Sequence, residues 1–154
     1  METVIIYTDG SCSPNPGNGG WGAILIHGAK RKEISGNAKE TTNNRMELTA
    51  AIEGLKCLNS ECKVLLTSDS RYVVNGINSW ARKWQRKNWT TSQKKPVLNI
   101  DLWQEILALT ATHTVMAVWV RGHNGDVENE RADVLATTAM LGADTNIEVL
   151  YERR

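Results

Sequence analysis

The sequence has no apolar run that approaches the ~18 residues needed to cross a bilayer, and it has few cysteines. Its first residues, METVIIYTDG, lack the basic region and the apolar core of a signal peptide. The cysteines Cys12, Cys57 and Cys62 are an odd number without the spacing of a metal knuckle. These absences argue against membrane-spanning, disulfide-stabilised and zinc-knuckle proteins. We therefore expect a cytoplasmic protein with reduced cysteines and no membrane partner.

Acidic residues are missing from one long segment, although the net charge of the whole chain is only +1. Between Ser70 and Ile100 there is no aspartate or glutamate. The same segment contains the basic residues Arg71, Arg82, Lys83, Arg86, Lys87, Lys94 and Lys95. A nearly neutral protein with one basic segment is expected to meet a polyanion on one face.

The length of 154 residues and the apolar content of 41% suit one domain with a buried core, and no internal repeat or low-complexity linker divides the chain. Apolar alternation predicts strands at Val4–Asp9, Gly20–His27, Lys32–Asn37, Lys63–Ser68 and Thr114–Val120, with a turn at Gly28. Helical spacing predicts helices at residues 45–58, Ser70–Gln85, Ile100–Leu109 and Glu128–Leu141, the first preceded by capping residues at 41–44. Hairpin-like strands followed by alternating helices and strands predict an α/β domain with a mixed sheet.

Two predicted strands end in an aspartate that is followed at once by small residues. These are IIYTDGS at Asp9 and LLTSDSR at Asp69. Ligands of open α/β sheets gather at the carboxyl ends of the strands, so the two carboxylates are expected side by side. A structural alternative stays open for each, because aspartate often starts a turn by bonding nearby backbone N–H groups.

Two further acids belong to predicted helices. Glu47 borders the apolar stripe of its helix, where an unpaired carboxylate is costly, and no lysine or arginine stands three or four residues away to pair with it on the same helix face. Asp133 lies in the first turns of the last helix, where the helix dipole favours an acid in any case. Converging carboxylates repel unless a cation lies among them, and oxygen ligands select Mg²⁺ or Mn²⁺. Such a site serves phosphoryl transfer.

The motifs TDGS, NNRMEL, SDSRYV and GHNGDVENERAD, in this order and spacing, resemble those of bacterial type 1 ribonuclease H from about Val4 to Met140. The resemblance implies a five-stranded mixed sheet, an antiparallel meander plus parallel strands, flanked by helices. It also implies hydrolysis of the RNA strand of RNA–DNA hybrids by a two-metal-ion mechanism with 3′-hydroxyl and 5′-phosphate products. Asp9, Glu47, Asp69 and Asp133 occupy the positions of the family's metal-binding carboxylates, for Mg²⁺ with Mn²⁺ as a substitute.

His123 matches the family's mobile histidine. Gly122 and Gly125 flank it, which predicts a pliable loop between a strand and a helix. An imidazole there could carry protons to or from the reacting groups near neutral pH. The alternative is a loop histidine that is simply solvated. The following loop, NGDV, carries Asp126 and lacks a proline that some relatives have there.

The resemblance also implies a set of substrate contacts. Residues expected to contact the minor groove of the hybrid are Cys12, Asn15, Asn43 and Asn44. Thr42 and Asn99 are expected to form a pocket for a phosphate of the DNA strand. The stretch WARKWQRKNW is expected to form a basic protrusion, with Trp80, Lys83, Trp84, Arg86 and Lys87 as its contact residues. Because Trp80 and Trp84 repeat at i,i+4, core packing is the alternative for part of that set. Arg71 departs from the neutral amide of many relatives, and its guanidinium could add a phosphate contact.

We expect a single domain over residues 1–154 with the protrusion at about 80–95, acting as a monomer without an obligate protein partner. Two other functions stay open. A non-catalytic hybrid-binding module would keep the basic segment but has no need for four acids. A DNA nuclease of the same fold would have the acids but no need for the asparagine set.

Overall fold

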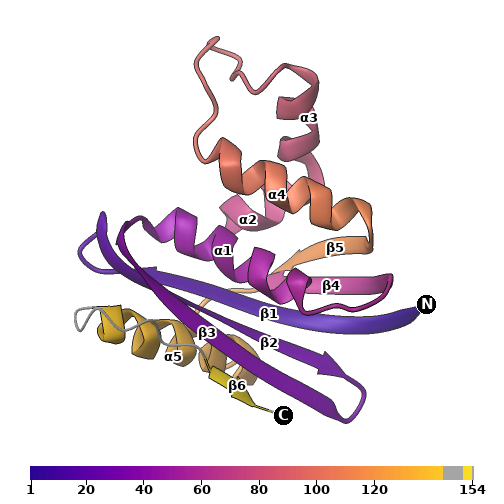
Figure 1. Ribbon diagram of the computed structural model, residues 1–154, viewed down its shortest axis with the longest axis vertical. Coiled ribbons are helices and arrows are strands. Elements are labelled where there is room, and N and C mark those ends of the chain that lie inside the picture. The colour runs from indigo at the N-terminus through magenta and orange to yellow at the C-terminus, as the bar shows by residue number, and fades with distance from the viewer. Residues whose placement is uncertain (144–150, 154) are drawn as a thin grey trace.

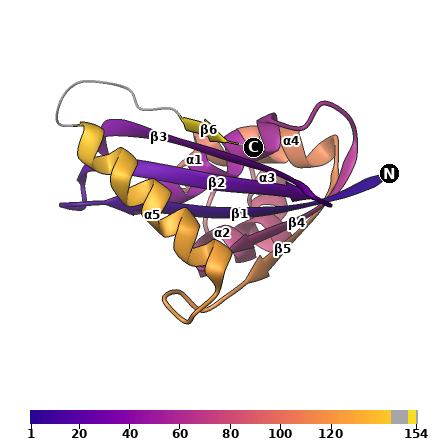
Figure 2. The same ribbon diagram turned by 90° about the horizontal axis from the view of Figure 1, so that it is seen from below.

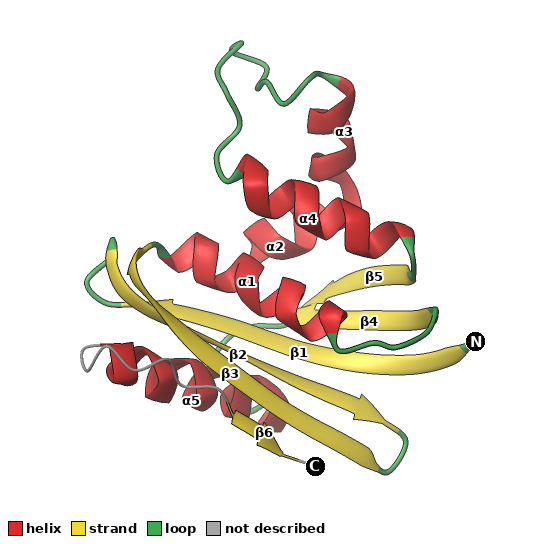
Figure 3. Cartoon of the chain, in the orientation of Figure 1, coloured by secondary structure: helices red, strands yellow, loops and turns green. Residues whose placement is uncertain are grey.

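The computed structural model describes residues 1–143 and the backbone of residues 151–153. Its centre is a mixed sheet with the strand order β5-β4-β1-β2-β3-β6 (Figures 1 and 3). Strands β1 (Glu2–Cys12), β2 (Gly17–His27) and β3 (Lys30–Thr41) form the antiparallel meander, and β4 (Cys62–Ser68) and β5 (Thr114–Trp119) add parallel to β1. The predicted five-stranded mixed sheet is confirmed. A short strand that was not predicted, β6 (Tyr151–Arg153), pairs with β3.

Strands β2 and β3 extend further than their apolar patterns predict. Strand β2 begins at Gly17 instead of Gly20, and β3 continues to Thr41 instead of ending at Asn37. The added residues pair backbone to backbone, with Gly17 opposite Thr41 and a register shift between Gly17 and Gly19. Ladder hydrogen bonds need no apolar side chain, so an alternation pattern cannot reveal glycine-rich or polar strand ends.

Side-chain caps mark the starts of the first and last helices, and the cap of the first was predicted within residues 41–44. Thr42 caps α1 (Asn43–Lys56) and Asp126 caps α5 (Val127–Gly142), each through a side-chain oxygen that accepts a backbone N–H. Helix α4 (Ile100–Ala111) runs as predicted and two residues further. The single helix predicted at Ser70–Gln85 is instead α2 (Arg71–Asn75), a π-helical turn η1 (Gly76–Trp80) and α3 (Ala81–Arg86). One extra residue in a turn leaves the apolar pattern nearly unchanged, so spacing does not predict it.

Helices cover both faces of the sheet. Helices α1, α2 and α4 lie on one face, and α5 crosses β1, β2 and β3 on the other (Figure 2). The larger core lies between the sheet and the helices α1, α2 and α4, and it includes the fully buried Ile6, Leu48, Leu66 and Trp103. A smaller core joins Ile24 of β2 to Ala132 and Leu135 of α5. In the part of the chain that the structure describes, no helix is long and apolar enough to cross a membrane.

An ion-pair network fastens α5 to β3. Glu33, which is 3% exposed, accepts hydrogen bonds from Arg131 of α5 (Nε to Oε2 2.9 Å, Nη2 to Oε1 3.0 Å) and from Arg31 (Nη2 to Oε2 2.8 Å). Arg31 also pairs with Glu128 in the first turn of α5. The Arg131 hydrogen bonds, followed by that of Arg31, lower the pKa of Glu33 to about 2. The network holds the N-terminal half of α5, and with it Asp133, against the sheet.

One side chain binds the outer edge of β5 at a single residue. Asn78 of η1 donates its amide Nδ2 to the backbone oxygen of Ala117 (2.9 Å) and accepts the Ala117 N–H on Oδ1 (2.9 Å). The N–H and C=O of Ala117 point away from β4, and both therefore have a hydrogen-bond partner.

Candidate active site

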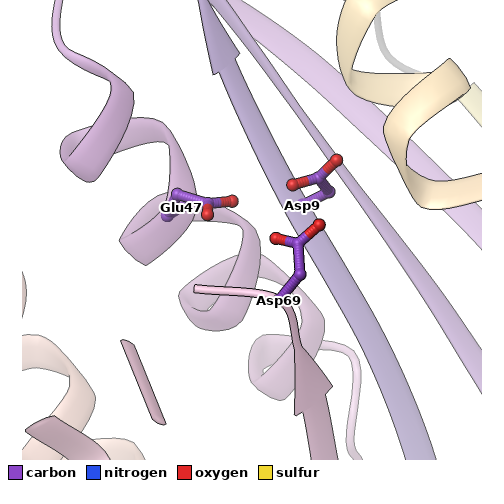
Figure 4. Close-up of side chains that lie close together, drawn as sticks. All are labelled: Asp9, Glu47 and Asp69. Carbon is purple, nitrogen blue, oxygen red and sulfur yellow. The ribbon is translucent and has the colours of Figure 1, made fainter. Parts of the chain in front are cut away.

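Three carboxylates meet where β1, α1 and the end of β4 come together. Asp9, Glu47 and Asp69 each offer an oxygen, and these oxygens lie within 4.8 Å of one another. Figure 4 shows the three side chains pointing toward a common space. Asp9 and Glu47 are both 5% exposed, and Asp69 is half-buried. The prediction that Asp9 and Asp69 lie side by side is confirmed.

The backbone explains this meeting. Thr8 pairs with Ser68 in the parallel ladder between β1 and β4, so the next residue of each strand is an aspartate at the same edge. Gly10 lets α1 approach that edge, because a Cβ on Gly10 would lie 2.3 Å from the backbone nitrogen of Glu47. Any larger residue at Gly10 would push Glu47 away from Asp9.

Burial and mutual repulsion make it unfavourable for all three carboxylates to be charged at once. Burial, then the charges of Glu47 and Asp69, raise the pKa of Asp9, and burial raises the pKa of both Glu47 and Asp69. Oxygen Oε1 of Glu47 is buried and has no hydrogen-bond partner. Within the described residues no lysine or arginine forms an ion pair with the three acids. A metal ion fits this donor set, because it would satisfy the free oxygen and relieve the repulsion.

Replacing Asp9 by asparagine should stabilise the metal-free protein by on the order of 1 kcal/mol, the equivalent of about one pKa unit. Because the folded state holds the Asp9 proton more tightly than the unfolded chain, wild-type stability in EDTA should fall as the pH rises above the ordinary carboxyl pKa of 3.8. The advantage of the variant should therefore grow with pH. Added Mg²⁺ should stabilise the wild type more than the variant.

Thermal melts of both proteins between pH 5 and pH 8, in EDTA and in Mg²⁺, measure these differences. An Asp9→Asn protein that melts below the wild type in EDTA would show that Asp9 acts mainly as a turn residue.

Asp133 borders the cluster without belonging to its tightest group. It is half-buried on α5, hydrogen bonding with it raises the pKa of Asp9, and its charge raises the pKa of Asp69. Within the described part of the chain, the 4.8 Å grouping consists of Asp9, Glu47 and Asp69. The assignment of Asp133 as a fourth metal ligand stays a prediction.

Asn129 is a site residue that the sequence analysis missed. Its side chain is buried, and its Nδ2 lies 3.5 Å from Oδ2 of Asp69. This contact lowers the pKa of Asp69 and so opposes the effect of burial. Asn129 stands four residues before Asp133 on α5, and this i,i+4 spacing was the signal available in the sequence.

His123 lies in the loop between β5 and α5, exposed and with φ of 54°. An electrostatic interaction with His123 lowers the pKa of Asp69, so the imidazole lies within electrostatic reach of the cluster. The loop comes close to the same carboxylate at Gly122, where a Cβ would lie 2.8 Å from Oδ2 of Asp69. Gly125 has φ of +85°, a conformation that other residues rarely adopt.

The residues assigned to the minor groove form one surface from two segments. Oδ1 of Asn15 accepts a hydrogen bond from the backbone nitrogen of Asn43 (3.1 Å), and Asn44 is exposed beside it. The Cys12 thiol lies among the carbonyl oxygens of Pro14, Gly17 and Thr41 at 3.3–3.5 Å. The loop after β1 and the start of α1 are thus joined.

Thr42 and Asn99 are connected through Arg45, which the sequence analysis did not single out. The Thr42 hydroxyl accepts the Arg45 backbone N–H (3.2 Å), and Nη1 of Arg45 donates to Oδ1 of Asn99 (3.3 Å). Asn99 has φ of 61°, and its Nδ2 donates to the Tyr72 hydroxyl (3.1 Å). Asp101 binds the Arg45 guanidinium at 2.8 and 3.0 Å. These contacts hold Thr42 and Asn99 close to each other between α1 and α4, and their assignment to a phosphate pocket stays a prediction.

The basic protrusion consists of α3 and the loop to α4, which stand away from the sheet in Figure 1. Lys83, Arg86 and Lys87 are exposed. Trp84 is half-buried and packs on Trp103 of the core, with a ring-centroid distance of 5.7 Å. Trp80 lies 6.0 Å from Trp84 and is 38% exposed. The core-packing alternative therefore holds for Trp84 and not for Trp80.

Known proteins are similar to this chain over most of its length. The RNase H family model matches residues 1–141. A ribonuclease H from Alcanivorax borkumensis is 55% identical over 136 residues, which cover 88% of this chain and 90% of the relative. The structure of LC9-RNase H1, a type 1 RNase H with the type 2 active-site motif, is similar with a TM-score of 0.85, 30% identity and coverage of 99% of this chain and 78% of that chain.

A second solved structure is LC11-RNase H1 in complex with an RNA/DNA hybrid. It is similar with a TM-score of 0.69 and 25% identity, and the match covers 91% of this chain and 98% of that chain. The family model and the curated relative each match most of the sequence. The chain belongs to the ribonuclease H family.

Proposed function

We propose that the chain hydrolyses the RNA strand of RNA–DNA hybrids at the cluster of Asp9, Glu47 and Asp69, leaving 3′-hydroxyl and 5′-phosphate ends. The observation that carries this proposal is the grouping of three carboxylates, two buried and one half-buried, whose oxygens lie within 4.8 Å of one another, with one buried Glu47 oxygen unpaired. Membership of the ribonuclease H family supports the substrate class, and LC11-RNase H1 was solved with such a hybrid bound.

The metal is proposed to be Mg²⁺, with Mn²⁺ as a substitute, held by Asp9, Glu47, Asp69 and Asp133. When bound, two such ions supply an activated water and neutralise the charge that develops on the leaving oxygen. The chain's part is to hold oxygen ligands that select a hard cation and to keep water away from one side of them, since Asp9 and Glu47 are buried.

His123 is proposed to carry a proton to or from the reacting groups at its imidazole. Its exposed loop position, within electrostatic reach of Asp69, supports this role. Because a water could replace the imidazole, we assign His123 an assisting role.

Replacing His123 by alanine should slow turnover by roughly 10²-fold or less, the low end for acid–base assistance. Single-turnover cleavage of a labelled hybrid at saturating Mg²⁺ measures this. A His123→Ala protein as inactive as Asp69→Asn would show that the histidine is indispensable, against the assignment.

Strand recognition is proposed to use three surfaces. Cys12, Asn15, Asn43 and Asn44 would meet base edges and 2′-hydroxyls in the minor groove, where RNA differs from DNA. Thr42 and Asn99 would hold a DNA phosphate, and the exposed cations of the protrusion would follow the backbone. Trp80, being partly exposed, is available to that surface, whereas Trp84 mainly supports it.

Replacing Lys83, Arg86 and Lys87 together by alanine should raise KM and flatten the salt dependence of hybrid binding. Fewer counterions are released when fewer cations contact phosphates, and three lost contacts should reduce the slope of log K against log salt by about 2 to 3. The choice of the RNA strand should not change, because the minor-groove surface is intact. An unaltered KM and slope would mean that these cations are only solvated.

The decisive experiment incubates the protein with labelled RNA–DNA hybrid, duplex DNA and duplex RNA, each with Mg²⁺ or EDTA. Mg²⁺-dependent cleavage of the RNA strand in the hybrid alone is the expected result. Binding without cleavage would indicate a hybrid-binding module, and cleavage of duplex DNA would indicate a DNA nuclease of this fold.

We further propose that residues 1–154 form a single domain, with the basic protrusion at about 80–95, that acts as a monomer. All the clustered carboxylates come from one chain, so cleavage needs no second copy. A cytoplasmic location is proposed from the cysteine pattern, since an odd number of cysteines without metal-knuckle spacing is typical of reduced thiols.

A further inference from the structure

The end of strand β5 carries an aromatic side chain bound to the turn that presents Asp69. The indole Nε1 of Trp119, the last residue of β5, donates to the backbone oxygen of Asp69 (3.1 Å). The Val120 N–H donates to the Ser68 oxygen (3.0 Å), so β5 remains joined to β4 up to the cluster. Trp119 therefore has a fixed position relative to a metal-binding carboxylate.

Arg71 lies over a face of this indole. Its guanidinium carbon is 4.0 Å from the centre of the Trp119 ring. A cation over an indole face is attracted by the ring, and the contact restricts the long side chain to few rotamers. Arg71 is itself exposed, and Trp119 remains 38% exposed, so both side chains are accessible to a large ligand.

The donors of Arg71 are not used by protein carboxylates. Among the residues that the structure describes, Arg31, Arg45 and Arg131 are each paired with an acid, whereas no ion pair involves Arg71. A planar guanidinium that is held in place without a carboxylate partner suits bidentate binding of a phosphate. It stands two residues from Asp69, beside the proposed cleavage point.

We propose that Arg71 and Trp119 form a platform that binds a backbone phosphate of the hybrid next to the phosphate that is cut. Arg71 makes the contact, and Trp119 is a positioning residue that holds the guanidinium and ties it to the Asp69 turn. This inference rests on the proposed function, since it names a further contact of the same substrate.

The test measures hybrid binding in EDTA, where no cleavage occurs, by fluorescence anisotropy at several KCl concentrations. Arg71→Gln should weaken binding about three- to tenfold and reduce the slope of log K against log salt by about 0.9, the value for one phosphate contact. Trp119→Leu should do nearly the same, and the double variant should lose little more. Trp119→Phe keeps a ring under the guanidinium, so its slope should stay near that of the wild type.

The matched control is Lys63→Gln, which removes one exposed positive charge at the opposite end of β4. Equal effects of Arg71→Gln and Lys63→Gln would overturn the phosphate contact. Additive losses in the double variant, or a Phe variant as weak as the Leu variant, would overturn the role of the ring. Wild-type protein that shows the Arg71–Trp119 coupling but cleaves nothing in Mg²⁺ would support the platform and refute the proposed function.

Discussion

Replacing Asp69 by asparagine should abolish cleavage while leaving the affinity for the hybrid within a few fold of the wild type. Asparagine keeps the shape of the side chain and removes one of three clustered carboxylates. The loss should be on the order of 10³-fold or more, the upper end of what removing one electrostatic group from an active site costs. Affinity should persist because binding depends on phosphate and groove contacts made elsewhere.

Single-turnover cleavage in Mg²⁺ and binding in EDTA measure the two quantities separately. Glu61→Gln is the matched control, because it neutralises an exposed carboxylate before β4, at the end of that strand far from the cluster. It should cleave like the wild type. Cleavage by a clean preparation of Asp69→Asn at near wild-type rate would refute the assignment of the metal site.

Replacing Glu33 by glutamine should destabilise the protein by about 3 to 5 kcal/mol, the cost of breaking a buried ion pair from one side. The change leaves Arg131 and Arg31 facing an amide in place of a carboxylate that accepts hydrogen bonds from both. For a chain of this size the melting temperature should drop by roughly 6 to 20 °C. Because the pKa of Glu33 is lowered to about 2, its stabilising effect is complete above its ordinary value of 4.5 and disappears as the pH falls toward 2.

Thermal melts of Glu33→Gln and wild type at pH 7 and at pH 3 measure both effects. Asp101→Asn is the comparison, since it breaks a similarly bidentate pair with Arg45 in which the Asp101 side chain is 65% exposed. That pair should contribute about 1 kcal/mol or less. A Glu33→Gln protein that melts like Asp101→Asn would show that the buried network adds little to stability.

The sequence predicted most of the fold because its elements carry strong local patterns. Apolar strands that end in aspartate, and capping residues such as Thr42 before a helical stripe, placed Asp9, Glu47 and Asp69 correctly. Parallel pairing then brought the two strand ends together, a consequence of sheet geometry that needs no knowledge of side-chain contacts.

The features that were missed depend on contacts between distant segments. Arg45 and Trp119 act through partners 50 or more residues away, and Asn129 reaches Asp69 from another element. The π-helical turn at Gly76–Trp80 replaced a continuous helix, because local spacing does not distinguish the two. Single-sequence patterns report which face of an element is apolar, and they do not report which polar side chains meet.

The Asn78 amide at the edge of β5 has a consequence for association between molecules. An unpaired strand edge presents N–H and C=O groups to which another chain can add as a strand, and such addition starts aggregation. Because the side chain of Asn78 occupies both groups of Ala117, it takes the place of one peptide unit of a neighbouring strand. Ala117 is flanked by Met116, which is 60% exposed, and by Val118. Without the Asn78 amide, an added strand would bury these two apolar side chains. The Asn78 amide therefore blocks strand addition at this point of the β5 edge. Neither a β-bulge nor a charged residue is needed at Ala117 for this purpose.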